Sequence, residues 1–563
     1  MSSRLATALS LVALVFAAGC AQKATRPFEV VAVIPFEDLS VQGGGFAGEA
    51  LAWMAARQTQ GDAKIRVVEA PNYRTGQATR TISGWLENRG GKLVVSGQVR
   101  DEESQKVLRT FRLTGSEAEL SKLATSVAGY TGAPVKSIPE VKAEALAAYF
   151  AARRATSAAD AGALADRALT ADPSFGAVAL LKYELLARAG DQAGSEAALR
   201  QVRAAKLTEA DQASLALLKA RGKKDLAGQA GAILKLAKLQ GADTQLWRQL
   251  LEIQFVTRDF RAAADSAARI LELSPADEDA LNRRGYAFAF AGDLDAARKA
   301  FEEYRLARPD SANAIDSLAE ALFYSGKFAE ASKLFAEAGR KEPHALNGSE
   351  PFRAALSALL AGDAAGADKL YAVYREGRKN DPTLVLRDGI WAAMKRQNSE
   401  FPQDAAGLAT ASMLALGQGN RAQAATLAAE ARKLAHSPQE GTLAFTAWAI
   451  SQPSASPEIW ARRMSAMLPD PRQADLRLEL LGWSLLLDGH YSQSASIWRA
   501  AVDRTSMLTN NDQRILLVWC LLENGQKDEA KKVMPHGWLP PASLDPGLGV
   551  LFYPRIQELS TKL

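Results

Sequence analysis

Hydrophobic, small and helix-breaking residues between positions 244 and 343 recur with a single period. Prolines stand 34 residues apart in this stretch, and three further classes of residue keep the same spacing. The recurring sets are Pro275, Pro309 and Pro343; Ala263, Ala297 and Ala331; Phe260, Leu294 and Phe328; and Trp247, Leu281 and Ile315. Because several residue types share one spacing, the pattern predicts three copies of one structural unit.

Each unit has the residues expected of two antiparallel helices. The small alanine allows the helices to cross closely, Gly292 and Gly326 open the turns between them, and the proline ends the second helix. Phe301 and Phe335 fill the space beneath the crossings. The period and these residues resemble the tetratricopeptide repeat. The resemblance implies an α-solenoid whose inner surface is formed by the first helix of each pair.

The same pattern extends beyond the central units, over residues 141–535. A first unit closes at Pro173, and later units keep the paired glycines and alanines. Residues 209–241 fit poorly, because residues 222–224 (GKK) interrupt the first helix early. We predict about ten helix pairs with degenerate outer units. Residues 536–563, which begin with prolines, are expected to form a C-terminal capping segment.

Before the array, the pattern changes to that of strands and short helices. A continuous apolar run at residues 30–36 predicts a buried strand, and a helix with one apolar face follows from Phe46. We further expect a strand at residues 65–68, a helix at 75–89, two strands at 93–100 and 107–113 joined as a hairpin, and a helix at 116–130. This order, βαβαββα, defines a small α/β domain over residues 28–130, and residues 131–140 form a linker. The predicted fold class is α with a small α/β domain.

Two motifs of this small domain carry a second resemblance. Residues 31–40 (VAVIPFEDLS) resemble the opening of the TolB amino-terminal-like domain, where a strand ending Val-Leu-Pro-Phe precedes Glu-Asn-Leu-Ser. The departures in this stretch are Ile34 and Asp38. Residues 97–100 (GQVR) are similar to a later strand of that family, which reads Gly-Ser-Val-Arg. The curli-type secretion lipoprotein also has a Val-Ala-Val-x-Pro-Phe strand and is the alternative, although that family lacks a long repeat array.

The chain begins with the pattern of a signal peptide. A mostly apolar run at residues 5–18 is too short for a permanent membrane helix. The run ends in a glycine and Cys20, an ending that resembles the bacterial lipobox, in which cleavage leaves a lipidated amino-terminal cysteine. The resemblance implies a signal peptide at residues 1–19 and a lipidated tether at residues 20–27. An ordinary secretory signal is the alternative, because Ala17 stands where lipoboxes usually carry leucine.

The residue after the cysteine bears on the location of the protein. Ala21, rather than aspartate, follows Cys20, and by resemblance to enterobacterial lipoproteins this implies the outer membrane. Several acyl chains, at about 0.8 kcal/mol per buried CH₂ group, make such anchoring stable. We therefore expect a lipid-anchored protein that faces the periplasm.

Composition and charge narrow the range of functions. Of the 563 residues, 48% are hydrophobic and 23% are charged, and the net charge at pH 7 is only +5. Such a small net positive charge for a chain of this length is not typical of a nucleic-acid-binding protein. Cys520 is the other of the two cysteines, so a lipidated Cys20 leaves no internal disulfide. We expect Cys520 to be a buried small hydrophobic residue.

The sequence shows no motif for metal binding, cofactor binding or catalysis. The histidines are His344, His436, His490 and His536, and none has a histidine or cysteine partner at metal-ligand spacing. The three glycines at residues 43–45 lack the Lys-Ser or Lys-Thr of a phosphate loop. Walker, kinase and Gly-x-Ser-x-Gly motifs are absent from the sequence. We therefore expect no metal, no cofactor and no catalytic residue.

The repeat register predicts which side chains face the inner surface. They lie one, five or eight residues after the large apolar residue that begins each unit. This predicted partner-binding groove comprises Arg248, Glu252 and Phe255; Asn282 and Tyr286; and Asp316, Glu320 and Phe323. The set lacks the lysine and asparagine pattern of the carboxylate-clamp repeats, so an extended peptide or a helix suits it better than a chaperone tail. Alternatively, the rings pack between neighbouring helices and the charges are simply solvated.

Together these features predict a non-catalytic, outer-membrane-anchored scaffold or adaptor that binds protein or peptide partners in the periplasm. An envelope signalling or secretion component of the curli-type lipoprotein class is one alternative. An enzyme with an unrecognised site is another. A signalling regulator normally carries a DNA-binding or kinase module, and the sequence contains neither.

Overall fold

The structure is a computed structural model of the chain, and it falls into two compact units. Unit 1 is Met1–Asp277 and unit 2 is Glu278–Leu563. The described residues are 28–562 without 41–44, 60–64, 70–77, 137, 202–206, 241–242, 344–347, 453–455, 503–510, 534–557 and 560. Cys20, with the predicted signal peptide and tether, lies outside them, as does most of the predicted capping segment. Among the described helices, none combines the length and the apolar character that crossing a membrane requires.

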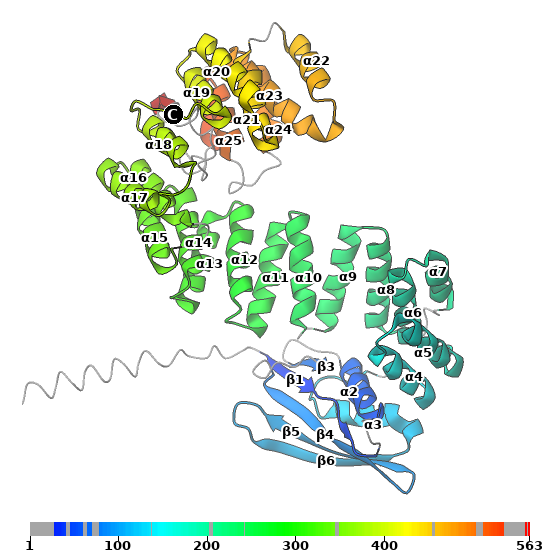
Figure 1. The fold of residues 1–563 in the computed structure, drawn as a ribbon. Helices are drawn as coiled ribbons and strands as arrows, with labels where there is room; N and C mark the ends of the chain where they lie inside the picture. The colour runs from blue at the N-terminus through cyan, green and yellow to red at the C-terminus, as the bar shows by residue number, and fades with distance from the viewer. Residues whose placement is uncertain are drawn as a thin grey trace, which may run out of the picture. The chain divides into compact units, whose positions relative to one another are not determined.

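Unit 1 begins with a mixed β-sheet (Figure 1). Its elements are β1 (Glu29–Val33), β2 (Glu37–Asp38), α2 (Ala47–Gln58), β3 (Ile65–Glu69), β4 (Arg80–Arg89), β5 (Lys92–Asp101), β6 (Val107–Gly115), the 3₁₀ helix η1 (Glu117–Glu119) and α3 (Leu120–Gly129). The strand order is β3-β1-β4-β5-β6, with β2 beside β4. Strand β1 is parallel to β3 and β4, whereas β4, β5 and β6 form an antiparallel meander. A mixed-sheet domain followed by a helical array confirms the predicted fold class.

One predicted element of this domain is wrong. The helix expected at residues 75–89 is replaced by β4, which pairs along its whole length with β5. Ile82 and Leu86 are fully buried and four residues apart, a spacing that fits a helix face as well as one face of a strand. Between β4 and β5, Gly90 and Gly91 have φ of 60° and 77°, as a two-residue hairpin turn requires. This Gly-Gly pair was the local signal for the hairpin.

A glycine in β5 allows an aromatic side chain to lie flat on the sheet. Gly97 pairs with Gly84 of β4 on one side and with Phe111 of β6 on the other. A Cβ atom at position 97 would overlap the Phe111 ring. That ring in turn stacks on Tyr130, with the ring centroids 4.2 Å apart. The glycine of residues 97–100 is therefore needed for close packing beneath α3.

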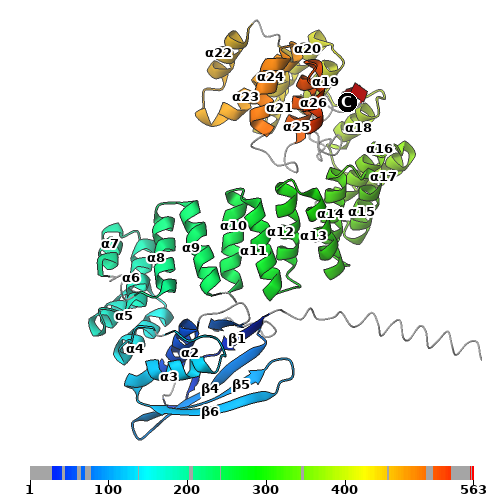
Figure 2. The ribbon, with the colours of Figure 1, turned by 180° about the vertical axis from the view of Figure 1, so that it is seen from behind.

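The remaining helices of unit 1 follow in antiparallel pairs (Figure 2). They are α4 (Ala143–Arg154), α5 (Ala158–Ala171), α6 (Gly176–Arg188), α7 (Gln192–Gln201), α8 (Glu209–Gly222), α9 (Leu226–Leu239), α10 (Thr244–Val256) and α11 (Phe260–Leu273). The first of them share a hydrophobic core with the sheet domain.

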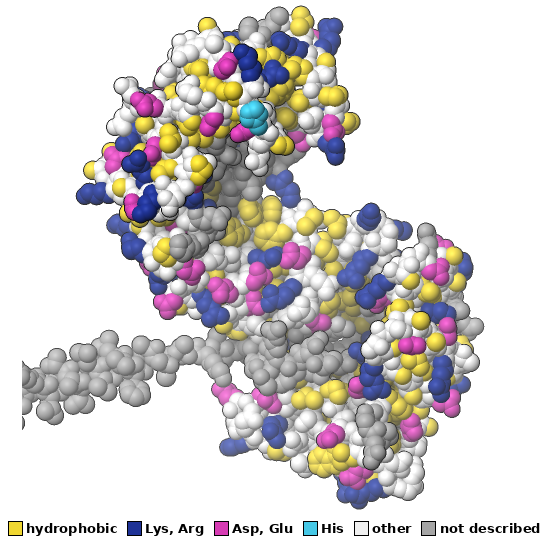
Figure 3. Space-filling view, viewed as in Figure 1, with side chains coloured by type: hydrophobic (Ala, Val, Ile, Leu, Met, Phe, Trp, Pro, Cys, Tyr) yellow, Lys and Arg dark blue, Asp and Glu magenta, His cyan; other side chains and the backbone are white. Residues whose placement is uncertain are grey.

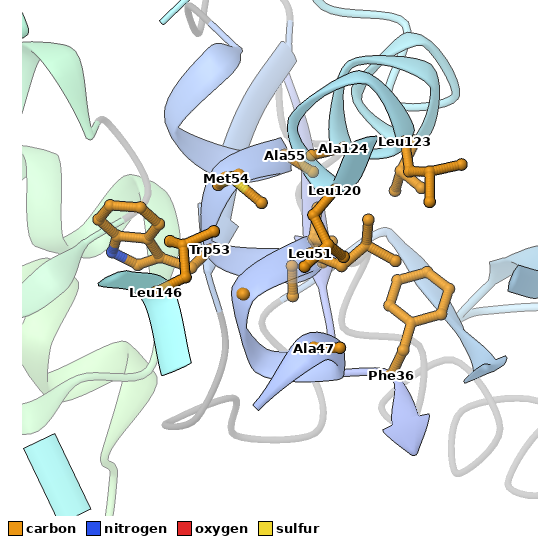
Figure 4. Packing of buried hydrophobic residues seen from close by; sticks show 14 of the residues in the cluster. Phe36, Ala47, Leu51, Trp53, Met54, Ala55, Leu120, Leu123, Ala124 and Leu146 are labelled. Atoms are coloured by element: carbon orange, nitrogen blue, oxygen red, sulfur yellow. The ribbon is translucent and has the colours of Figure 1, made fainter. Parts of the chain in front are cut away.

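Trp53 of α2 joins the sheet domain to these helices. Figure 4 shows Leu51 of α2 beside Leu120 of α3, while Trp53 points the other way, toward Leu146 of α4. The Trp53 ring centroid lies 5.5 Å from that of Tyr149, 5.9 Å from that of Phe150 and 6.2 Å from that of Phe175. These rings are buried. A single aromatic cluster therefore spans α2, α4 and the start of α6.

From Lys224 to Gly326 the turns within the helix pairs keep the 34-residue period. Four turn residues with φ between 55° and 82° follow at this spacing: Lys224, Arg258, Gly292 and Gly326. After the first three, an aspartate caps the next helix by accepting a hydrogen bond from a backbone N–H: Asp225, Asp259 and Asp293. The interruption predicted at residues 222–224 is therefore wrong, because α8 and α9 form a full pair. Lys224 adopts the left-handed conformation that glycine adopts in the later units.

Unit 2 contains further helix pairs. Its helices are α12 (Glu278–Phe290), α13 (Leu294–Ala307), α14 (Ala312–Tyr324), α15 (Phe328–Lys341), α16 (Glu350–Leu360), α17 (Ala364–Glu376), α18 (Leu384–Met394), α19 (Ala405–Gly417), α20 (Arg421–Leu434), α21 (Pro438–Ser451), α22 (Pro457–Met467), the 3₁₀ helix η4 (Pro471–Gln473), α23 (Ala474–Leu487), α24 (Tyr491–Val502), α25 (Asn511–Glu523) and α26 (Lys527–Val533). Ala297 and Ala331 are fully buried at the crossings, as predicted from the register.

Substitution of Gly285 tests the packing within one helix pair. A Cβ atom there would overlap the Phe301 ring, so Gly285→Ala should destabilise the protein by about 1–3 kcal/mol. Gly441 of α21 has open space around it, and Gly441→Ala should be neutral or stabilise by up to about 1 kcal/mol. Thermal unfolding followed by circular dichroism measures both. Equal melting temperatures for the two variants would contradict the close crossing.

Candidate functional site

Three of the predicted groove residues lie on α10 in unit 1. Arg248 forms an ion pair with Asp277, and its side chain is 33% exposed. Glu252 is exposed, and Phe255 is half-buried against Phe260, with the ring centroids 5.9 Å apart. The face of α10 therefore carries charged and aromatic groups, and Arg248 already has a partner within the chain.

The predicted groove residues of unit 2 meet on α12 and α14. The hydroxyl of Tyr286 donates a hydrogen bond of 2.6 Å to Oε2 of Glu320, one repeat further along the chain. The hydroxyl of Ser317 donates to Oδ1 of Asn282 at 3.0 Å. All four side chains are polar, and Asn282, Tyr286 and Glu320 are half-buried. Two successive first helices are thus joined by hydrogen bonds across the predicted inner face.

Arg353 of α16 extends this arrangement to a third helix. Its guanidinium group donates to both carboxylate oxygens of Asp316, at 3.1 and 3.2 Å, and lies 3.0 Å from Oε1 of Glu320. The side chains of Asp316, Glu320 and Arg353 are 5%, 17% and 21% exposed. We call the six residues of this network the polar row: Asn282, Tyr286, Asp316, Ser317, Glu320 and Arg353.

Burial raises the pKa of two acidic groups in the polar row, Asp316 and Tyr286. Burial raises the pKa of Asp316 to about 7, because desolvation of the carboxylate outweighs the nearby Arg353 guanidinium and the carboxylates of Glu320 and Glu350 oppose its charge. Burial, reinforced by Glu320, raises the pKa of the Tyr286 phenol far above its usual value. Glu350 itself is 1% exposed, and its Oε2 has no hydrogen-bond partner among the described residues. Burial also raises the pKa of Glu350.

Phe323 lies inside the helix pair rather than on its surface. Its side chain is 4% exposed, and its ring contacts Phe328 edge-on with the centroids 5.4 Å apart. Beside it is a hollow of about 10 Å³ that Glu320, Tyr324, Phe335, Arg353 and Leu356 also line. This volume holds about one water molecule. A role for Phe323 and for the buried Asp316 in partner binding stays a prediction, and the packing of Phe323 is that of a core residue.

Sequence reasoning missed Ser317 and Arg353. Ser317 follows the predicted groove residue Asp316, and its hydroxyl is fully buried between α14 and α12. Arg353 lies on α16, whose repeat does not keep the strict 34-residue spacing: it is 37 residues from its partner Asp316. The available signal was electrostatic: two acidic residues one turn apart on a largely buried helix require a cation nearby.

A second feature, in unit 1, was not predicted. A cavity of about 460 Å³ lies where the sheet domain meets α8 and α9, lined by Arg57, Lys136, Thr208, Glu209, Gln240 and Asp243 among others. Ion pairs flank it: Arg57 with Asp211, and Lys136 with Glu209 at 3.9 Å. Further along, Arg66 of β3 pairs with Glu272 of α11 at 3.0 Å. In each pair the cation belongs to the sheet domain or linker and the acid to the array.

The remaining candidate chemistry is sparse in the described part of the chain. His436 and His490 are exposed, whereas His344 and His536 lie outside the described residues. No group of histidine, cysteine and acidic side chains suited to a metal ion occurs among the residues described. Cys520 is buried, its thiol donates to Ser494 Oγ at 3.3 Å, and burial raises its pKa to about 12. Both charge signs are interspersed over the visible surface of each unit (Figure 3).

Comparison with known proteins adds structural neighbours only. No protein-family model and no curated protein match the chain. YrrB, described as a tetratricopeptide protein with an unusual peptide-binding site, is 14% identical and covers 30% of this chain and 86% of its own, with a TM-score of 0.25. MamA from Desulfovibrio magneticus RS-1 is 14% identical over 31% of this chain and 98% of its own, with a TM-score of 0.26. The C-terminal part of a tetratricopeptide protein from Cytophaga hutchinsonii is 13% identical over 42% of this chain and 96% of its own, with a TM-score of 0.33.

These TM-scores are low, so the repeat architecture rests on the helix pairs themselves. The turns from Lys224 to Gly326 and the buried alanines from Ala263 to Ala331 keep one 34-residue period.

The raised pKa of Asp316 predicts a dependence of stability on pH. Because burial raises its pKa to about 7, the Asp316 carboxyl ionises at a higher pH in the folded protein than in the unfolded chain, where its usual pKa is 3.8. The stabilising contribution of the protonated group is therefore lost as pH rises through this window. The free energy of unfolding of Asp316→Asn, taken relative to that of the parent, should therefore rise by about 1–3 kcal/mol between about pH 5 and about pH 8.

Denaturant unfolding at several pH values measures this difference. Glu330→Gln, at an exposed position on α15, is the matched control and should show no such trend. A pH-independent difference for Asp316→Asn would mean that the folded protein holds this carboxyl ionised at neutral pH.

Proposed function

We propose that the protein is a non-catalytic scaffold that binds protein or peptide partners along the first helices of its array. The observation that carries this proposal is the polar row, in which three successive first helices present half-buried polar groups on one face. Hydrogen bonds hold these side chains in fixed positions before any partner arrives. Fixed side chains lose little conformational entropy on binding, and this favours recognition.

The chemistry of the row favours a polar or helical segment over a purely apolar one. Glu320 and Arg353 present opposite charges side by side, and Tyr286 adds a ring that packs on Phe301 at 5.1 Å. Such a mixture suits a partner that offers its own donors and acceptors around an apolar anchor. YrrB, described as having a peptide-binding site on the same kind of repeat, is an analogy for this use of the fold.

We further propose that the chain is a lipoprotein, anchored through Cys20 in the outer membrane and facing the periplasm. The support is the sequence at residues 5–20. The sheet domain is proposed to be TolB amino-terminal-like. Its support is that residues 31–40 and 97–100 carry the resemblance, and that Gly97 has a packing role.

Photo-crosslinking tests the inner face as a binding surface. Benzoylphenylalanine replaces Glu252 or Asn282 on first helices, and in matched controls it replaces the exposed Asp265 or Lys299 on second helices. Envelope extracts are added and adducts are identified by mass spectrometry. We expect defined adducts from the first-helix positions only, because a partner in the groove lies within reach of them. Equal labelling from second helices would refute the proposed face.

Lipidation is tested by labelling with palmitate. The parent chain should incorporate the label and sediment with membranes, and Cys20→Ser should abolish both. Cys520→Ser is the control, because Cys520 is buried and should not be acylated. A Cys20→Ser variant that still sediments, together with an unlabelled parent chain, would show that the anchor is wrongly assigned.

A further inference from the structure

Two arginines in unit 2 share one tryptophan ring, away from the polar row. The guanidinium carbon of Arg432 on α20 lies 4.4 Å from the ring centroid of Trp448 on α21, and that of Arg463 on α22 lies 4.9 Å from it. Arg432 also lies 5.6 Å from the ring centroid of Phe445. We call Arg432, Phe445, Trp448 and Arg463 the arginine–tryptophan patch.

The two guanidinium groups have no anionic partner in the part of the chain that is described. Both side chains are exposed, and neither forms an ion pair or a hydrogen bond there. The neighbouring Lys433 pairs with Glu430 at 2.9 Å, whereas Arg462 is exposed and likewise lacks a described partner. Residues 453–455, which precede α22, contain no acidic side chain. Among the described residues, therefore, no acidic side chain pairs with the two guanidinium groups at the rings.

The ring contacts prepare these arginines for an anion. A guanidinium group stacked on an aromatic face is restrained, and its edge keeps the N–H donors that match a carboxylate. Trp448 contacts both groups, each within 4.9 Å of its ring centroid, and their like charges repel each other. An acidic ligand relieves that repulsion and meets donors that have already lost much of their freedom.

The adjoining face of α22 supplies apolar contact area. Ile459, Arg463 and Met467 follow one another at intervals of four residues, so they lie on one side of the helix. Ile459 is 54% exposed and Met467 is 37% exposed. Trp460 and Met464, which follow Ile459 and Arg463 directly in the sequence, are buried and pack the adjoining side of the helix. In Figure 3, Lys and Arg side chains are prominent over the part of unit 2 where α20 and α22 lie in Figure 1.

We propose that the arginine–tryptophan patch binds an acidic segment of a partner protein. Carboxylates of the segment pair with Arg432 and Arg463, and apolar residues beside them cover Ile459 and Met467. Charge complementarity selects the acidic segment, and the apolar stripe selects a segment with interspersed hydrophobic residues. This surface shares no residue with the polar row, so an experiment can refute one of the two proposed binding surfaces without refuting the other.

A peptide suits this surface better than an anionic membrane. Polybasic membrane sites gather about four to eight lysines and arginines, whereas the unpaired cations here are Arg432, Arg462 and Arg463 among the described residues. Glu458 and Asp470 lie near the two ends of α22 and would be repelled by a flat anionic surface. A narrow segment contacts the arginines without approaching these acids.

Fluorescence anisotropy with the full-length protein tests the proposal. The probes are labelled synthetic peptides in which glutamates alternate with leucines at varied spacing, and the same peptides with glutamine at each glutamate position. The parent should bind the acidic peptides in preference. Arg432→Gln with Arg463→Gln should weaken that binding by about tenfold or more, the loss expected for charge-assisted hydrogen bonds.

The matched control removes the same charge elsewhere. Arg261→Gln with Arg340→Gln, at exposed positions on α11 and α15, should leave peptide binding unchanged. Trp448→Leu, if its circular dichroism is unaltered, should also weaken binding, because the ring restrains both arginines. Equal affinities for the two double variants, no preference for acidic peptides, or no effect of Trp448→Leu would each overturn the proposal. Patch-dependent binding to phosphatidylglycerol vesicles without peptide binding would replace the protein partner by a membrane.

Discussion

Two helix pairs of unit 2 depend on the contact between a large ring and a residue with almost no side chain. In unit 2, Gly285 receives the ring of Phe301, and Gly482 receives that of Trp498, whose Cζ2 would lie 2.6 Å from an added Cβ. Buried alanines such as Ala297 serve the same close approach on the partner helix. Because the helices must pass at this distance, a small residue and a ring are required at fixed positions in these pairs.

This constraint explains why the repeat register could be predicted from the sequence while other features could not. In the central repeats the small residues and turns recur at a constant interval, so local pattern suffices to find them. The error at residues 75–89 arose because Ile82 and Leu86 satisfy a helix period and a strand period equally. The ion pairs of the sheet domain had no local signal at all. Arg57 and Asp211 are 154 residues apart, and Arg66 and Glu272 are 206 apart.

The positions of several candidate-site residues could be predicted from the sequence, but their hydrogen-bond and ion-pair partners could not. The register placed Tyr286 and Glu320 one repeat apart on successive helices, and the structure shows a hydrogen bond between them. The register did not predict that Arg353 forms ion pairs with Glu320 and Asp316, because these pairs join two repeats that are not 34 residues apart. Charges that are mostly buried must find partners within the chain. A surface composed of such groups is therefore stiff, and a ligand has to fit its existing hydrogen bonds.

The position of β1 in the sheet has a mechanical consequence. It is the first described element of the chain, and it lies between β3 and β4 rather than at an edge. Its backbone runs parallel to both neighbours, with five residue pairs to β3 and three to β4. A pull on the amino-terminal end acts along this strand, so the hydrogen bonds on both sides share the load in shear instead of opening one after another. A chain held by its amino terminus would transmit tension into the middle of the sheet.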